Sequence, residues 1–144
     1  MARMKKMAPG LKESQIQALL IDWWASYCRT RGLVDERLLM ASAGGAVLGG
    51  DARLRAIRSA NLRRQGYRNG TPDLFLAVPK GNPMARGEIL FSGLFIELKR
   101  AAQSKPTQAQ LEMADLLRRR GYCVVIACGF EEAQRAIIGY VEKD

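Results

Sequence analysis

The sequence predicts an α/β fold in which a central mixed β-sheet is flanked by helices. Two observations support this: amphipathic periodicity near both ends of the chain, and short apolar runs with strand character between them, in the order α, β, β, α, β, α. The chain has 144 residues, enough for one compact domain and too few for a second core. We therefore expect residues 1–12 to form a basic N-terminal tail and residues 13–144 to form a single domain.

The first helix is expected over residues 12–30, ending before Gly32, because apolar side chains recur at intervals of three and four. They are Ile16, Leu19, Leu20, Trp23, Trp24 and Tyr27. The spacing places Glu13 on the core-facing side of the first turn, although an acidic residue there also suits the positive end of the helix dipole. The aromatic residues could form an interface with a second copy or could pack the monomer's own core.

A mobile excursion rich in Gly and Arg is expected at about residues 42–66. Residues 37–50 begin apolar and end in paired glycines, which favour loops over regular elements. Residues 51–65 are consistent with either a short helix or an ordered basic loop, and the pattern does not decide between them.

Two strands are expected next, over residues 73–78 and 90–99, with a connecting loop at residues 79–87. Pro72 suits the start of the first strand, because proline is tolerated only at strand starts and edges. In the second strand, Phe95, Glu97 and Lys99 point to one face. The alternate residues are all apolar, so one face is apolar and the other is charged.

The third helix has the clearest limits. Thr107 and Gln110 form a T-x-x-Q capping box at its start, and the helix is expected to run to Arg120 and stop at Gly121. A buried strand over residues 122–128 and an amphipathic helix over residues 131–141 complete the chain.

The composition favours nucleic acid as a partner and excludes several kinds of catalysis. The net charge is +9, and residues 29–68 contain nine arginines against three acidic residues. Six of these arginines are candidate DNA contacts: Arg53, Arg55, Arg58, Arg63, Arg64 and Arg68. The chain contains no histidine, which excludes Ser-His-Asp catalysis and His-ligated zinc.

The cysteines and the hydropathy pattern indicate a cytoplasmic protein without a membrane partner. Cys28, Cys123 and Cys128 lack the CxxC spacing, so neither a zinc site nor a disulfide framework is predicted. No apolar run approaches the ~20 residues needed to span a bilayer, and the N-terminal residues lack the apolar core of a signal peptide.

Asp73, Glu97 and Lys99 are the candidate catalytic centre. If the two strands that carry them pair, their side chains can converge. Carboxylate oxygens are ligands for Mg²⁺ or Mn²⁺, and a nearby ammonium could orient a water or neutralise charge in the transition state. Each motif alone is more often structural than catalytic. Their combination in a basic chain favours metal-assisted phosphodiester chemistry.

Four motifs together resemble the VRR-NUC domain of the PD-(D/E)xK nuclease superfamily. They are G-T-P-D-L at 70–74, F-I-E-L-K at 95–99, T-x-x-Q ahead of L-L-R-R-R-G-Y, and the helical E-x-x-I-Q at 13–17. The resemblance covers residues 13–138, and the chain is similar to the stand-alone type of this domain that phages and prophages carry. It implies a restriction-endonuclease-like core and a metal-dependent DNA endonuclease, active in a bacterial or phage-infected cell.

The resemblance also implies roles for individual residues. Glu13, Asp73, Glu97 and the backbone carbonyl of Leu98 match the metal ligands of the superfamily, for Mg²⁺ or Mn²⁺. Lys99 matches its catalytic lysine, and Gln110 matches a glutamine that supports the site. Similarity to Holliday-junction resolvases implies a homodimer and a branched, flap or Holliday-junction-like substrate.

Two other functions are open from the sequence. A catalytically idle DNA-binding protein would keep the fold and the basic surface, but it has no chemical need to keep Asp, Glu and Lys together. An enzyme acting on a small phosphorylated substrate would use similar metals, but the arginine-rich segment and the lack of a P-loop glycine motif disfavour it.

Overall fold

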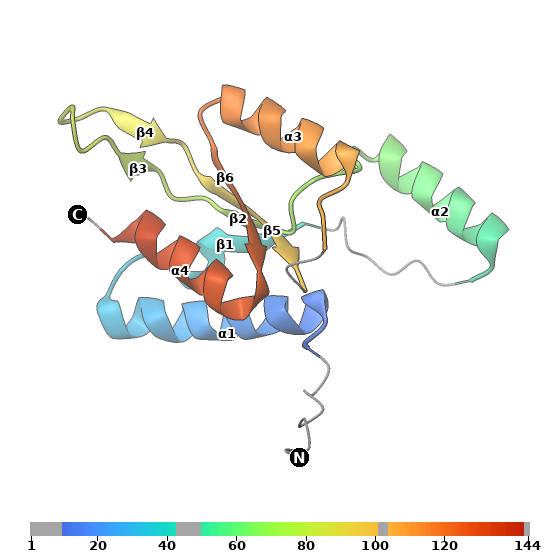
Figure 1. The fold of residues 1–144 in the computed structure, drawn as a ribbon, viewed down its shortest axis with the longest axis horizontal. Helices are drawn as coiled ribbons and strands as arrows, with labels where there is room; N and C mark the ends of the chain where they lie inside the picture. Colours follow the sequence, from blue (N-terminus) through green and yellow to red (C-terminus); the bar gives the residue numbers. More distant parts are fainter. Residues whose placement is uncertain (1–9, 43–49, 101–103, 143–144) are drawn as a thin grey trace, which may run out of the picture.

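The computed structural model describes residues 10–42, 50–100 and 104–142, and it confirms the predicted α/β class (Figure 1). A four-stranded mixed sheet, in the order β1-β2-β5-β6, lies between helices. In chain order the elements are α1 (Glu13–Arg31), η1 (Glu36–Leu38), β1 (Leu39–Ala41), α2 (Ala52–Arg64), β2 (Leu74–Leu76), β3 (Lys80–Gly81), β4 (Ile89–Phe91), β5 (Leu94–Lys99), α3 (Gln108–Arg119), β6 (Cys123–Cys128) and α4 (Gly129–Val141).

The central strand pair sets the topology of the sheet. β5 pairs with β6 in parallel, and α3 makes the crossover between them. β2 is antiparallel to β5 on its other side, and β1 is antiparallel to β2 at the edge. β5 and β6 are six residues long and β1 and β2 only three, so the sheet narrows toward β1.

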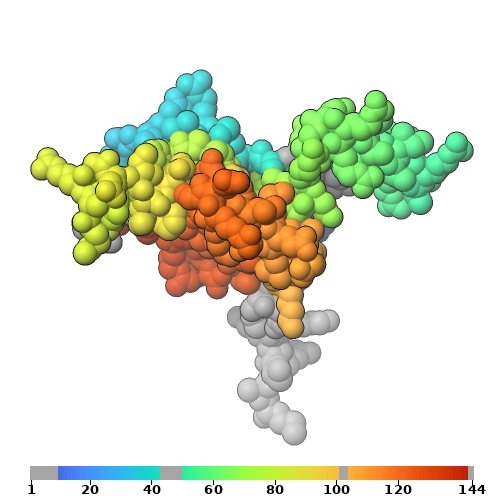
Figure 2. Space-filling view, turned by 90° about the horizontal axis from the view of Figure 1, so that it is seen from above, coloured from blue at the N-terminus to red at the C-terminus, as the bar shows by residue number. Residues whose placement is uncertain are grey.

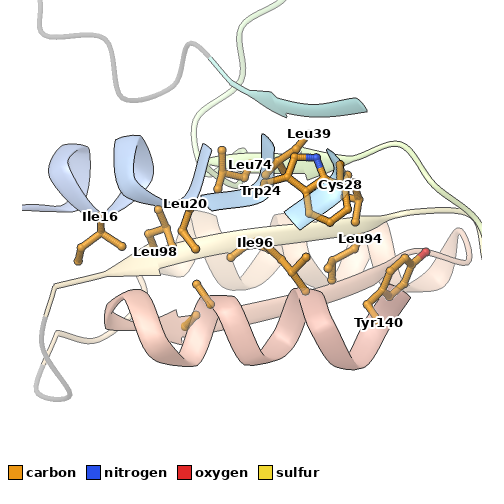
Figure 3. Packing of buried hydrophobic residues seen from close by; sticks show 14 residues of the cluster. Ile16, Leu20, Trp24, Cys28, Leu39, Leu74, Leu94, Ile96, Leu98 and Tyr140 are labelled. Carbon is orange, nitrogen blue, oxygen red and sulfur yellow. The ribbon is translucent and has the colours of Figure 1, made fainter. Parts of the chain in front are cut away.

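One face of the sheet is covered by α1 and α4, and the main core lies between these layers (Figure 3). α1 contributes Ile16, Leu20, Trp24 and Cys28 at every fourth position, as its periodicity predicts. Trp24 is 1% exposed, and its Nε1 donates to the carbonyl of Glu36, so it packs the monomer's own core and is not available to a second copy. Trp23 and Tyr27 are partly buried against the same core.

The opposite face carries an aromatic cluster and α3. The rings of Phe75 and Phe95 stack at 4.4 Å, and Tyr122 meets Phe95 edge-on at 5.3 Å. α3 begins after Thr107 and ends at Arg119, close to the predicted limits, and it reaches both the sheet and the end of β5.

The predicted strand over 90–99 and the predicted loop over 79–87 are both wrong in part. The long strand is broken at Ser92 and Gly93 into β4 and β5, and β4 turns away from the main sheet to pair with β3 in a hairpin. A side chain at Gly93 would meet the ring of Phe75, so the backbone of this residue lies directly against β2. The turn residues between 79 and 87 concealed the two-residue strand β3.

The segment after α1 also differs from the prediction. The expected loop is replaced at its start by η1 and β1, a strand too short to show periodicity in the sequence. Residues 43–49 of the predicted mobile excursion lie outside the described residues. Residues 52–64 form the helix α2, which Asp51 caps by accepting from the N–H of Leu54 at 2.8 Å.

Two findings concern the cysteines and the hydropathy of the helices. Cys28, Cys123 and Cys128 are free thiols. Among the helices that the structure describes, none is both long and apolar enough to cross a membrane.

Candidate active site

The pairing of β2 with β5 brings Asp73 and Glu97 together. The register joins Leu74 to Ile96, and one further step places Asp73 opposite Glu97, with both side chains on one face. Asp73 was expected inside a strand over 73–78, but β2 is only Leu74–Leu76 and Asp73 immediately precedes it. The predicted convergence of the two acids is nevertheless what the structure shows.

Asp73 is held by hydrogen bonds from both neighbouring segments of the chain, beside β1 and in β5. Its backbone carbonyl accepts from the N–H of Ser42 at 2.8 Å, beyond the end of β1. Its carboxylate Oδ2 accepts from the N–H of Leu98 at 2.7 Å, on β5. The position of this carboxylate is therefore set by backbone contacts to both neighbouring strands.

The same hydrogen bond shows where the carbonyl of Leu98 points. In an extended strand the N–H and C=O of one residue point to the same side, so this carbonyl also faces the Asp73 side of β5. The register places Pro72 opposite Leu98, and proline has no N–H to donate. The Pro-Asp pair thus supplies a carboxylate for the N–H of Leu98 and leaves its carbonyl directed at the site.

Glu97 and Lys99 lie on a covered face. Glu97 is 5% exposed and Lys99 7% exposed, although alternation alone suggested a charged face on the strand. The Nζ of Lys99 lies 3.5 Å from Oε1 of Glu97. Two charged groups are stable at such burial only when they are paired and hydrogen-bonded, and a side chain of α3 supplies these hydrogen bonds.

Gln110 of α3 links Glu97, Lys99 and the N-terminal cap of the helix. Its Oε1 accepts from the N–H of Thr107 at 2.9 Å and from the Nζ of Lys99 at 2.8 Å, and its Nε2 donates to Oε1 of Glu97. Since Thr107 and Lys99 both offer donors, the oxygen of the amide must face them and its nitrogen must face Glu97. The helix cap and the site contact therefore coexist in one side chain.

The electrostatics of the site are those of crowded carboxylates. Burial, followed by repulsion from Asp73, raises the pKa of Glu97 to about 7, although Lys99 acts in the opposite direction. Burial also raises the pKa of Asp73, while the N–H of Leu98 opposes the rise. Near neutral pH the two carboxyl groups favour holding a proton between them, which is the condition that a cation would relieve.

Glu13 is more exposed than the sequence predicted. It is exposed on the first turn of α1, whereas the sequence placed it on the core-facing side. The reason is that the buried face of α1 begins only at Ile16, so the first turn extends beyond the covered part of the sheet. Its charge still acts on the site, because it raises the pKa of both Asp73 and Glu97.

The donor set fits a hard divalent cation that also takes ligands from solvent or substrate. Within residues 10–42, 50–100 and 104–142, no three Asp, Glu or Cys side chains form a metal-binding group by themselves. The contacts above engage Oδ2 of Asp73 and Oε1 of Glu97, so each carboxylate has a second oxygen for a cation. Two carboxylates and a backbone carbonyl are the oxygen donors that Mg²⁺ and Mn²⁺ accept.

Gly70 positions the loop that carries Asp73, a role that sequence reasoning missed. Its φ is +83°, and a Cβ there would lie 2.3 Å from the carbonyl oxygen of Ala109 in the first turn of α3. Only a glycine allows this loop to lie so close to the helix that carries Gln110. The glycine of the G-T-P-D motif was visible in the sequence, but its contact was not.

The six candidate DNA-contact arginines do not line this site. Five of them are on α2, and Arg68 follows it, with its Nη1 donating to the carbonyl of Arg63 at 2.9 Å. The C-terminal end of α2 lies beside the N-terminal end of α3, and the earlier part of the helix extends away from the body of the molecule (Figures 1 and 2).

Comparison with known proteins supports the resemblance seen in the motifs. No protein-family model matches the sequence, and no curated protein matches it. A solved structure described as a "VRR_NUC domain protein" superposes with a TM-score of 0.70 and 25% identity, over 93% of this chain and 91% of that chain. Another, described as a "VRR_NUC domain", has a TM-score of 0.46 and 21% identity, over 89% and 96%.

Proposed function

Because the chain has the fold and the motifs of a VRR-NUC domain, we propose that it is a Mg²⁺- or Mn²⁺-dependent DNA endonuclease. The observation that carries this proposal is that half-buried Asp73 faces the buried pair Glu97 and Lys99, which Gln110 joins. A structural ion pair needs neither a second carboxylate facing it nor a glutamine bridging it. Phosphodiester hydrolysis uses a pair of acids that can hold a metal ion and a positioned ammonium group, and the arrangement of Asp73, Glu97 and Lys99 supports this assignment.

Asp73, Glu97 and the carbonyl of Leu98 would hold the metal, and exposed Glu13 would act through water. The chemistry supplied by a bound divalent cation is polarisation of the scissile phosphate and a lower pKa for water. The chain itself contributes rigidity. Asp73 is held between β1 and β5, and Glu97 is held by Gln110, so the acids are preorganised before substrate arrives.

We propose that Lys99 acts on the reacting groups. Its ammonium has three N–H donors, of which Gln110 accepts one, and Glu97 pairs with its charge at 3.5 Å. A remaining N–H can donate to the attacking water or to a phosphate oxygen as negative charge develops. Burial strengthens such an interaction, because the surroundings screen it less than bulk water does.

The proposed substrate is DNA, contacted by the arginines of α2 and by Arg68. We further propose selectivity for branched, flap or Holliday-junction-like DNA, and a homodimer that presents two sites to two strands. These two proposals follow from the resemblance to the phage type. They are independent of the assignment of the catalytic residues.

A gel assay on linear, flap and four-way DNA tests the proposal. We expect cleavage with Mn²⁺ or Mg²⁺, none with EDTA, and none after Asp73→Ala or Lys99→Ala. The matched control is Asp115→Ala, which removes an exposed carboxylate of α3 that pairs with Arg119. Cleavage that survives both site substitutions would refute the proposal, and binding without any cleavage would favour an idle DNA-binding protein.

A further inference from the structure

Helix α2 is only lightly covered by the residues that the structure describes. None of its 13 residues is buried, and it projects from the body in both views (Figures 1 and 2). Isolated helices of this length are marginally stable in water, because tertiary packing normally supplies most of a helix's stability. An external partner would stabilise this helix, and its composition indicates which kind.

The arginines of α2 surround the helix instead of forming one stripe. At about 100° per residue, Arg53 and Arg64 lie on one side and Arg55 and Arg58 on the other, with Arg63 between them. Residues 52–64 contain no acidic side chain. A partner for this helix must therefore present negative charge on both of its sides at once.

We infer that α2 lies in the major groove of duplex DNA and holds the duplex beside the active site. A helix about 10–12 Å across fits a groove about 12 Å wide, with a phosphate strand on each side for the arginines. At 13 residues it is about 20 Å long and spans about six base pairs. The inference deepens the proposed function, and it rests on that function only in placing the cleavage point beside the duplex.

Other nucleic acids fit α2 less well. Single-strand binding uses aromatic side chains on which bases stack, and residues 52–64 contain none. The major groove of A-form RNA is too deep and narrow for a helix to enter. The shape and charge of α2 therefore favour duplex DNA over single strands and over double-stranded RNA.

The connection to the site is short and anchored. Asp73 follows the last residue of α2 by nine positions, and Gly70, within that connection, is seated against the first turn of α3. The end of α2 thus has a defined position relative to Asp73. Duplex held along α2 would place its continuation at the acids of the site.

The test is binding of a fluorescein-labelled duplex of about 20 base pairs, measured by anisotropy in EDTA at several salt concentrations. The variant is Arg55→Ala/Arg63→Ala, which removes two charges and keeps a good helix former at each position. We expect at least about tenfold weaker binding and a salt slope reduced by about two. The matched control is Arg119→Ala/Arg120→Ala, which removes two charges at the C-terminal end of α3 and should change affinity less than about threefold.

Four results would overturn the inference. The first is equal loss of affinity in the two double variants. The second is single-stranded DNA of the same length binding as tightly as the duplex. The third is no protection of guanine N7 from dimethyl sulfate in the bound duplex. The fourth is sedimentation showing a dimer in the wild type that only the α2 variant loses, because a second copy would then be the partner of α2.

The same assays separate this inference from the proposed function. Binding of duplex through α2 by a wild-type protein that cuts no DNA with Mn²⁺ would support the inference and contradict the nuclease. Cleavage that requires Asp73 and is unaffected by Arg55→Ala/Arg63→Ala, in affinity or in rate, would support the nuclease and overturn the inference.

Discussion

Replacing Gly70 by alanine should separate the positioning of the candidate active site from the stability of the fold. Gly70 has φ +83°, so an added Cβ costs about 1–2 kcal/mol in backbone strain alone. The Cβ would also lie 2.3 Å from the carbonyl oxygen of Ala109, where ordinary contact begins near 3.4 Å. The loop that carries Asp73 and the turn that carries Gln110 must therefore move apart by about 1 Å.

Gly66 is the matched control for this substitution. It lies in the same connection after α2 with φ +101°, and apart from its chain neighbours no described residue has an atom within 4 Å of where its Cβ would be. Gly66→Ala should therefore show the backbone strain alone, while Gly70→Ala adds a packing cost of about 1–3 kcal/mol. A shift of about 1 Å at a reacting centre costs on the order of a hundredfold in rate.

The assay compares the two variants by denaturant unfolding and by single-turnover DNA cleavage with saturating Mn²⁺. We expect Gly66→Ala to keep cleavage within about threefold of wild type, and Gly70→Ala to lose on the order of a hundredfold at a temperature where both are folded. Equal cleavage by the two folded variants would show that the contact between Gly70 and α3 does not position the site.

Three further outcomes follow from the contacts of the site. Gln110→Ala removes the partner shared by Glu97, Lys99 and the helix cap, so unfolding free energy should fall by about 2 kcal/mol and gel-measured cleavage at least tenfold; unchanged cleavage would exclude Gln110 from the site. In metal-free buffer, the folded state holds the proton of Glu97 more tightly than the unfolded state does, because its pKa is raised from 4.5 to about 7. Stability should therefore fall by roughly 3 kcal/mol as pH rises from about 4.5 to 7, with no further loss above that range, and pH-dependent unfolding of Glu97→Gln should lack this component. Mn²⁺ should raise the melting temperature of wild type at pH 8 and should not raise that of Asp73→Ala; an equal rise in both would place the metal elsewhere.

The elements that the sequence predicted well are those whose evidence is local. α1 and α3 were predicted within about two residues of their observed limits, since helical periodicity, a capping box and a terminal glycine all act within a few positions. The strand β6 was predicted from a continuous apolar run bounded by Gly121. In each of these elements the residues themselves carry the preference for the structure.

The elements that the sequence did not predict are too short to show a pattern or depend on partners distant in the chain. β1 has three residues and pairs with β2, far along the chain, whereas β3 and β4 have two and three residues and pair with each other in a hairpin. The predicted strand breaks at Gly93, where the ring of Phe75 occupies the space that a side chain would need. Residues 51–65 suited a helix or a loop, and only the structure shows the helix α2.

The candidate site divides in the same way. Sequence alone determined which groups are present: Asp73, Glu97, Lys99 and Gln110, without a histidine, in an order that matches VRR-NUC domains. Only the tertiary structure decided that Glu97 and Lys99 are buried, that Gln110 bridges them, and that Glu13 remains exposed. The physical reason is that alternation along a strand assigns side chains to faces, whereas what covers each face depends on where α1 and α3 come to lie on the sheet.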